Sequence, residues 1–126
     1  MNFMDKMNIS NVTMDMNNDS CQAKMKITAY HLQPYGLVHG GVWVAVAEEL
    51  AGRASIAFCQ TGTVPVGQSV SAQHLHPCQE GALITILGKL MHKGQHRHVW
   101  QFAFYNEKGA TVSRVTVDNA IICPKK

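Results

Sequence analysis

The chain has 126 residues, which is enough for one domain with one hydrophobic core. Hydrophobic residues make up 46% of the chain and charged residues 15%, a composition that excludes a disordered protein. The mild net charge of +3 does not indicate nucleic-acid binding, and no apolar run approaches the roughly 20 residues of a membrane span.

The N-terminal segment, residues 1–20, is rich in Met and Asn and has no long apolar core, so it does not resemble a signal peptide. We therefore expect a single domain over residues 1–126, located in the cytoplasm, with a loose N-terminus. Residues 7–16 could form a first strand, which leaves little room for a helix before it. Residues 21–28 alternate between apolar and polar side chains, which predicts a half-buried strand.

A long helix is predicted over His39–Phe58, after a loop at residues 30–38. The segment is apolar almost all the way round, and such a helix is buried rather than half-exposed. Gly40 and Gly41 stand at its start and carry no side chains, so another group can approach the free amides of the first turn. Those amides suit an anion or a polarised carbonyl oxygen.

Two adjacent carboxylates, Glu48 and Glu49, lie in the middle of this helix. Glu49 precedes Arg53 by four residues, which is the spacing of a helix ion pair. Glu48 has only small or apolar neighbours at helical spacing, and an unpaired carboxylate on such a face is costly. The simpler interpretation is a surface glutamate at a subunit boundary, but the pattern favours a functional Glu48.

Four segments with a period of two follow the helix and predict strands separated by hairpin turns. They cover residues 64–75, 82–92, 98–105 and 111–122. Short loops between successive strands imply an antiparallel sheet. The sequence therefore predicts an α+β domain in which a five- to six-stranded antiparallel sheet wraps around one long central helix.

Alternation along the first of these segments predicts that His74 faces the helix, on the same side as Val64, Val66, Val70 and Ala72. A histidine there is either a core residue or part of a site, and both interpretations stay open. Tyr35, Trp43 and Phe58 could line an aromatic pocket, although core packing is the first expectation for each. The four cysteines lack Cys-x-x-Cys spacing and are expected to be reduced and to act as small buried hydrophobes.

The segment Gln33–Gly41 (QPYGLVHGG), with Glu48 nine positions after His39, resembles the hotdog-fold acyl-CoA thioesterases. Residues 66–67 and 72–74 resemble the third strand of this family, and residues 91–101 and 105–109 resemble the hairpins of its aroyl-CoA branch. That branch includes 1,4-dihydroxy-2-naphthoyl-CoA thioesterases of menaquinone synthesis and hydroxybenzoyl-CoA thioesterases. The resemblance implies a hotdog fold and hydrolysis of an aromatic acyl-CoA, without a cofactor or a metal.

The resemblance also implies roles for individual residues. Glu48 matches the catalytic carboxylate, as a nucleophile or as a general base on water. Gly40 matches the backbone donor to the thioester carbonyl, and Gln33 matches a side chain that binds the same carbonyl. His39 and His74 match histidines of the pocket.

Two positions depart from the family pattern. Gly52 stands where relatives carry Ser or Thr, and His76 stands where relatives often carry Arg. The other candidate substrate-binding residues are Gly41, Lys93, Gly94, His96 and Arg97. The histidines at 92, 96 and 98 form, with Lys93 and Arg97, a mildly basic rim that is either a solvated turn or a contact for the phosphates of coenzyme A. A zinc site built from the same histidines is the weaker interpretation.

Gly40 and Glu48 are eight residues apart, or about 12 Å along a helix, so one carbonyl cannot contact both in a single chain. A shared site between subunits follows, and the partner is expected to be a second copy, in a homodimer or a homotetramer. The alternatives are a non-catalytic acyl-CoA-binding hotdog module and a medium- or long-chain acyl-CoA thioesterase. A hotdog hydratase is disfavoured because its His pattern is absent.

Overall fold

The computed structural model describes residues 2–124, which form two α-helices, a short 3-10 helix and six strands. In chain order they are α1 (Phe3–Lys6), β1 (Ile9–Asp15), β2 (Ser20–Lys26), η1 (Ala29–His31), α2 (Gly40–Phe58), β3 (Val64–His74), β4 (Leu83–Lys93), β5 (Arg97–Tyr105) and β6 (Thr111–Ile122). The predicted helix and strands are confirmed, with ends that differ by a few residues.

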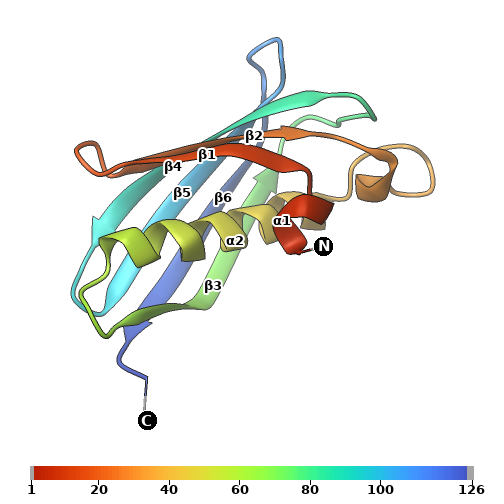
Figure 1. Ribbon diagram of the computed structural model, residues 1–126. Helices are drawn as coiled ribbons and strands as arrows, with labels where there is room; N and C mark the ends of the chain where they lie inside the picture. Colours follow the sequence, from red (N-terminus) through yellow and green to blue (C-terminus); the bar gives the residue numbers. More distant parts are fainter. Residues whose placement is uncertain (1, 125–126) are drawn as a thin grey trace.

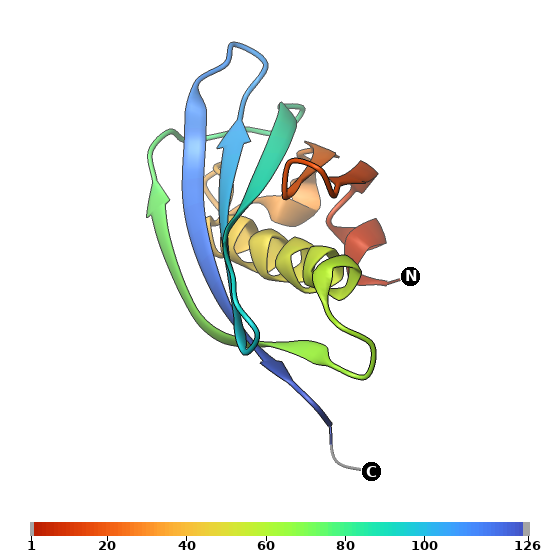
Figure 2. The same cartoon turned by 90° about the vertical axis from the view of Figure 1, so that its left-hand side faces the viewer.

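The six strands form one antiparallel sheet in the order β1-β2-β4-β5-β6-β3. The sheet curves around α2, which lies along its concave face (Figures 1 and 2). Strands β1 and β3 are the two edges, so each leaves one row of backbone groups unpaired within the sheet. The α+β prediction, with one long helix inside a wrapped sheet, is therefore confirmed.

The core lies between α2 and the concave face of the sheet. Trp43 of α2 is 2% exposed and packs on Phe104 of β5, with ring centroids 5.1 Å apart. At the other end of the helix, Phe58 packs edge-on against Trp100 at 5.7 Å. Burial of these large side chains holds α2 in one position, and so sets where its two ends meet the sheet.

The N-terminal segment is more ordered than its sequence indicates. Asn2 caps the four-residue helix α1, and its side chain accepts a hydrogen bond from Asp5 N at 2.9 Å. Met4 and Met7 are each 8% exposed and join the core. The first strand, β1, follows within the predicted range.

A bulge in β3 corrects the predicted alternation. The register shifts between Gly67 and Ser69, so the two halves of the strand present opposite residues to the helix. Val70 and His74 do lie on the helix side, whereas Val64 and Val66 lie on the opposite face and are 38% and 45% exposed. The extra residue of a bulge reverses the pattern, and nothing in the alternation of the sequence reveals it.

The structure tests the expectation that the cysteines are reduced and buried. All four cysteines are free; Cys21 and Cys78 are buried as expected, but Cys123 is exposed and Cys59 only half-buried. Within residues 2–124, neither helix combines the length and apolarity needed to cross a membrane.

Candidate functional site at the start of the central helix

A pocket of about 320 Å³ lies at the N-terminal end of α2. It brings together four of the predicted site residues, Gln33, Gly40, His74 and His76, from the loop before the helix, the helix itself and the end of β3. Six further residues between Tyr35 and Pro77 line it together with Cys78. The residues that resemble the thioesterase motif are thus neighbours in space, although about 40 positions separate Gln33 from His76 in the sequence.

Gln33 is held by a tight turn. Its backbone N–H donates to Leu37 O at 2.7 Å, and its carbonyl accepts from Gly36 N at 2.9 Å. Gly36 has φ +88°, a conformation that glycine adopts without strain. The side-chain Oε1 of Gln33 is buried and has no hydrogen-bond partner within residues 2–124. A fixed backbone and an unpaired carboxamide at a pocket wall suit the binding of a ligand.

Gly40 is the first residue of α2 and lies directly against the His74 ring. A Cβ atom at Gly40 would stand 2.6 Å from both Cδ2 and Nε2 of His74, which is too close for real atoms. Glycine is therefore the residue that permits the ring to cover the helix start. In the described part of the chain, no hydrogen bond takes the Gly40 N–H, as expected for the first turn of a helix.

Ser113 of β6 orients the His74 ring. Its hydroxyl donates to Gln73 O at 3.1 Å and lies 2.9 Å from His74 Nδ1, so it is placed to accept a hydrogen bond from an Nδ1–H group. The other ring nitrogen, Nε2, faces Gly40. Sequence reasoning missed Ser113. Its signal is a serine on the same face of β6 as the buried Val115 and Val117.

The other predicted residues near the helix start have different positions. His39 caps α2 through its backbone only, and its side chain is exposed and outside the pocket lining. Gly41 is exposed, and both Gly41 and Gly52 have open space where a Cβ would stand. Tyr35 is 75% exposed at the pocket mouth, so the expectation that it packs in the core is wrong.

Glu48 projects from α2 toward the edge strand β3. Its Oε2 lies 3.4 Å from the position that a Cβ of Gly67 would occupy. Contrary to the prediction of a fully buried helix, Glu48 is exposed in the single chain. Within residues 2–124 it forms no ion pair. Along the continuous helix, Glu48 stands about 12 Å from Gly40, as the sequence predicted.

The neighbouring Glu49 is paired as predicted. Arg53 Nε donates to Glu49 Oε2 at 2.9 Å, four residues along the same helix. One residue is a rotation of about 100°, so the two glutamates face different surroundings. Glu49 therefore has a structural partner, and Glu48 is available for a ligand or for a second subunit.

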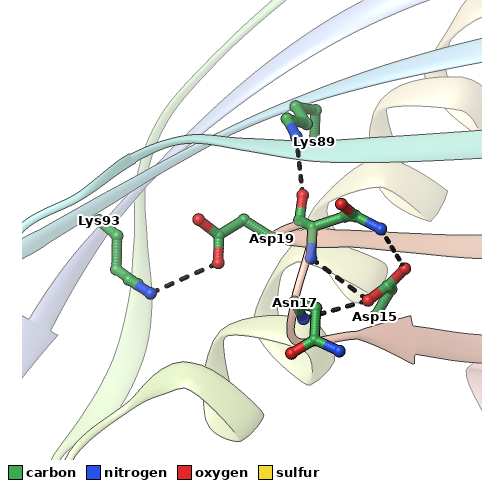
Figure 3. Close-up of polar contacts among 6 residues, drawn as sticks. Asp15, Asn17, Asp19, Lys89 and Lys93 are labelled. Atoms are coloured by element: carbon green, nitrogen blue, oxygen red, sulfur yellow. Dashed lines mark hydrogen bonds and ion pairs between the residues drawn. The ribbon is translucent and has the colours of Figure 1, made fainter.

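The predicted basic rim lies at the opposite end of α2, where a second pocket of about 470 Å³ includes Lys93 and Gly94 in its lining. Lys93 Nζ lies 3.4 Å from Asp19 Oδ1 (Figure 3). It also lies 5.6 Å from the centre of the Phe58 ring. Arg97 Nε donates to Asp118 at 2.9 Å. Both cations are about half-exposed and already have a carboxylate partner.

The Asp19 that pairs with Lys93 belongs to the turn between β1 and β2, which is itself well ordered. Asp15 accepts from Asn17 N at 3.1 Å and from the Asn18 side chain at 2.7 Å, and Lys89 Nζ donates to Asn18 O at 2.7 Å (Figure 3). The hydrogen bond from the Asn18 side chain lowers the pKa of Asp15. Lys93 therefore lies beside a rigid turn.

His98 lines the second pocket but is buried in its wall and is not exposed on the rim, which corrects the prediction. It is 2% exposed, and its Nδ1 lies 2.8 Å from Ser55 Oγ, which also accepts from Trp100 Nε1 at 2.7 Å. Burial lowers the pKa of His98, so the ring is neutral at pH 7. His96 is exposed and lies before the first residue of β5. In the range 2–124, no three His, Cys, Asp or Glu side chains are placed to hold a metal ion.

Cys78 lines the first pocket, but its surroundings do not favour nucleophilic chemistry. Burial raises the pKa of the Cys78 thiol, with a smaller contribution from the charge of Glu107. Burial also raises the pKa of Cys21, to about 12. Because the thiolate is the reactive form, both cysteines are unreactive at neutral pH. Neither of these two thiols is therefore placed to act as a nucleophile.

Comparison with known proteins agrees with this geometry. The family description "Thioesterase superfamily" matches residues 35–113, which include the helix start, Glu48 and His74. The chain is 30% identical to the 1,4-dihydroxy-2-naphthoyl-CoA hydrolase of Escherichia coli K12, over 83% of this chain and 76% of that protein. It is 29% identical to the proofreading thioesterase EntH of Cronobacter sakazakii, over 85% of this chain and 77% of that protein.

The fold is also found among solved structures. The crystal structure of yhdA from Lactococcus lactis superimposes with a TM-score of 0.90 at 33% sequence identity, covering 98% of this chain and 100% of that one. Such agreement over the whole chain includes the central helix and all six strands. The chain belongs to the thioesterase superfamily and is a thioester hydrolase with the hotdog fold.

Proposed function

We propose that the protein hydrolyses an aromatic acyl-CoA, such as 1,4-dihydroxy-2-naphthoyl-CoA or a hydroxybenzoyl-CoA, to the free acid and coenzyme A. The observation that carries this proposal is the convergence of Gln33, Gly40 and His74 on one pocket whose wall includes Trp43 and Tyr35. Aromatic side chains suit a flat, apolar acyl group. The name of one bacterial relative, a 1,4-dihydroxy-2-naphthoyl-CoA hydrolase, supports the same substrate class.

In the proposed reaction, the Gly40 N–H and the Gln33 carboxamide bind the thioester carbonyl oxygen, where negative charge develops. Glu48 supplies or activates the attacking oxygen. The new C–O bond forms, the C–S bond breaks, and the thiolate of coenzyme A leaves and takes up a proton. His74 Nε2 lies against the carbonyl site and helps to shape it. These residues require no cofactor.

A screen of substrates tests this proposal. Purified protein is assayed with 4-hydroxybenzoyl-CoA, 1,4-dihydroxy-2-naphthoyl-CoA and fatty acyl-CoA esters of medium and long chains. We expect kcat/KM for the aromatic esters to exceed that for the fatty esters at least about tenfold. A preference for fatty esters would instead identify a medium- or long-chain thioesterase, and tight binding without hydrolysis would identify an acyl-CoA-binding module.

The distance between Gly40 and Glu48 supports a site shared by two copies of the chain. The pair is about 12 Å apart on a rigid helix, and Glu48 is exposed beside an edge strand whose outer row of backbone groups is unpaired. A second copy can add its own β3 to this edge, so that the helix start of one chain faces the Glu48 of its partner. A homodimer is then the smallest active unit, and a homotetramer would contain two of them.

Mixing two inactive variants tests the shared site. A Glu48→Ala chain retains Gln33, and a Gln33→Ala chain retains Glu48, so one of the two sites in a mixed dimer is complete. After subunit exchange at equal amounts, we expect recovery of about a quarter of wild-type activity, because half of the dimers are mixed and each contains one good site. Differently tagged chains establish that exchange has occurred. Mixed dimers without recovered activity would exclude the shared site.

The pocket lined by Lys93 and Gly94 is the proposed contact for the nucleotide end of coenzyme A, together with the exposed His96 and Arg97 that follow in the chain. Its phosphates would compete with Asp19 and Asp118 for the two cations. We expect the double variant Lys93→Ala, Arg97→Ala to raise KM for the acyl-CoA about three- to tenfold, since half-exposed ion contacts are weak. A truncated pantetheine thioester lacks the phosphates and is the control, and an equal rise in its KM would count against this contact.

A cytoplasmic location stays a prediction, and the four free thiols support it. A role in menaquinone synthesis would follow only if 1,4-dihydroxy-2-naphthoyl-CoA is the preferred ester in the substrate screen.

A further inference from the structure

Asn119 of β6 is a buried polar residue whose side chain forms no hydrogen bond within the described chain. The residue is 2% exposed, and its Nδ2 has no hydrogen-bond partner within residues 2–124. Its Oδ1 makes no hydrogen bond with the described residues but, unlike Nδ2, is not fully buried. On the same face of β6, the neighbouring positions are the apolar Val117 and Ile121. A buried amide donor without a partner is destabilising, whereas an apolar side chain of similar shape would not be.

The position of Asn119 places this carboxamide beside Glu48. Asn119 pairs with Gly67 across β6 and β3, and Gly67 has no side chain to fill the space between the strand and the helix. The point where a Cβ of Gly67 would stand is 3.4 Å from Glu48 Oε2 and 3.9 Å from Asn119 Oδ1. Two oxygen acceptors therefore converge on one small space, one from α2 and one from the sheet.

A water molecule is the group whose chemistry fits this space. It carries two donors, one for Glu48 Oε2 and one for Asn119 Oδ1, and its remaining lone pairs point away from both. Gly52, one turn after Glu48 on the helix, has no side chain and so supplies no second polar group to this space.

We propose that Asn119 is a catalytic residue that holds, together with Glu48, the attacking water above Gly67. The inference rests on the proposed thioesterase function. The water gives one proton to Glu48 while its oxygen forms a bond to the thioester carbon. The C–S bond then breaks, and the thiolate leaves and receives that proton, so that acyl-CoA and water become the acid and the free thiol. Asn119 stays hydrogen-bonded to the water and limits its orientations, which lowers the entropy cost of attack.

Two variants test this role by different means. Asn119→Leu keeps a side chain branched at Cγ and removes both polar atoms. Gly67→Ala removes no functional group but places a methyl group in the space shared by the two oxygens, 3.4 Å from Glu48 Oε2 and 3.9 Å from Asn119 Oδ1, and Gly67 has no positive φ that would strain an alanine. For both we expect kcat on the best acyl-CoA ester to fall at least about tenfold, with KM changed less than about threefold. Thr116→Val, on the opposite face of the same strand, is the matched control and should keep kcat within about twofold.

Stability separates this role from a structural one. An Asn119 that served only the fold would lower the melting temperature when replaced and leave kcat per folded molecule unchanged. We expect instead that Asn119→Leu melts at the same or a higher temperature, because an unpaired buried amide has been removed.

The proposal requires kcat to fall in both variants, so a kcat within twofold of wild type in either one overturns it. If Asn119→Leu does not fold, Gly67→Ala decides the question alone. The wild-type protein and Glu48→Gln are assayed first. A wild-type protein inactive on every ester refutes the proposed function, whereas an active wild type with unaffected variants refutes only the role of Asn119.

Discussion

Glu48→Gln is expected to lower kcat at least about a hundredfold, which is the low end for the loss of acid–base function. The substitution keeps the shape of the side chain and removes its ability to accept a proton or to attack. Glu48 is exposed in the single chain and forms no ion pair within residues 2–124, so the fold should not depend on its charge. The measurement is kcat on one good aromatic acyl-CoA ester, with circular dichroism to confirm folding.

Glu49→Gln is the matched control, because it makes the same chemical change one residue along the helix. Glu49 is bound to Arg53 at 2.9 Å, and such a helix pair contributes at most about 0.5 kcal/mol to stability. We expect kcat of Glu49→Gln to stay within a few-fold of wild type. An inactive Glu49→Gln beside an active Glu48→Gln would show that the two carboxylates have been assigned to the wrong roles.

Gly40→Ala is expected to lower kcat/KM about a hundredfold, by crowding rather than by loss of a group. The new methyl group would stand 2.6 Å from Cδ2 and Nε2 of His74, so either the ring or the helix start must move. A displacement of about 1 Å at a catalytic centre can cost this much. Gly40 has no positive φ, and alanine favours helix more than glycine does, so the helix itself should form. Steady-state kinetics and the melting temperature are the two measurements.

Gly41→Ala separates crowding from a general change at the helix start. It adds the same methyl group at the next residue, where a Cβ meets nothing within 4 Å. Its loss of kcat/KM should be far smaller than that of Gly40→Ala. Equal losses in the two variants would mean that contact with His74 is not the cause, and that the start of α2 tolerates no side chain at all.

The elements of the fold could be predicted from the sequence because each has a local signal. The mostly apolar segment His39–Phe58 contains no proline and ends before the polar residues Gln60 and Thr61. The structure has a helix over Gly40–Phe58. Alternating residues and Gly-containing turns located the four strands that follow. The bulge between Gly67 and Ser69 had no such signal, and it reversed the predicted side of Val64 and Val66. A bulge depends on the pairing of two strands, which alternation within one strand cannot report.

Some features of the site could likewise be predicted from the sequence, and others could not. The sequence by itself determined three features of the central helix: a glycine at its start, an unpaired Glu48 beside a paired Glu49, and the helical distance that separates Glu48 from Gly40. Each of these follows from spacing along one helix, whose geometry is regular. Only the tertiary structure decided how residues from other elements complete the site. It placed Gln33 and His74 at the helix start, where Ser113 orients His74. It also buried His98 against Ser55 and set Asn119 opposite Gly67. Strand register and core packing bring these residues together, and both arise from contacts between residues far apart in the chain.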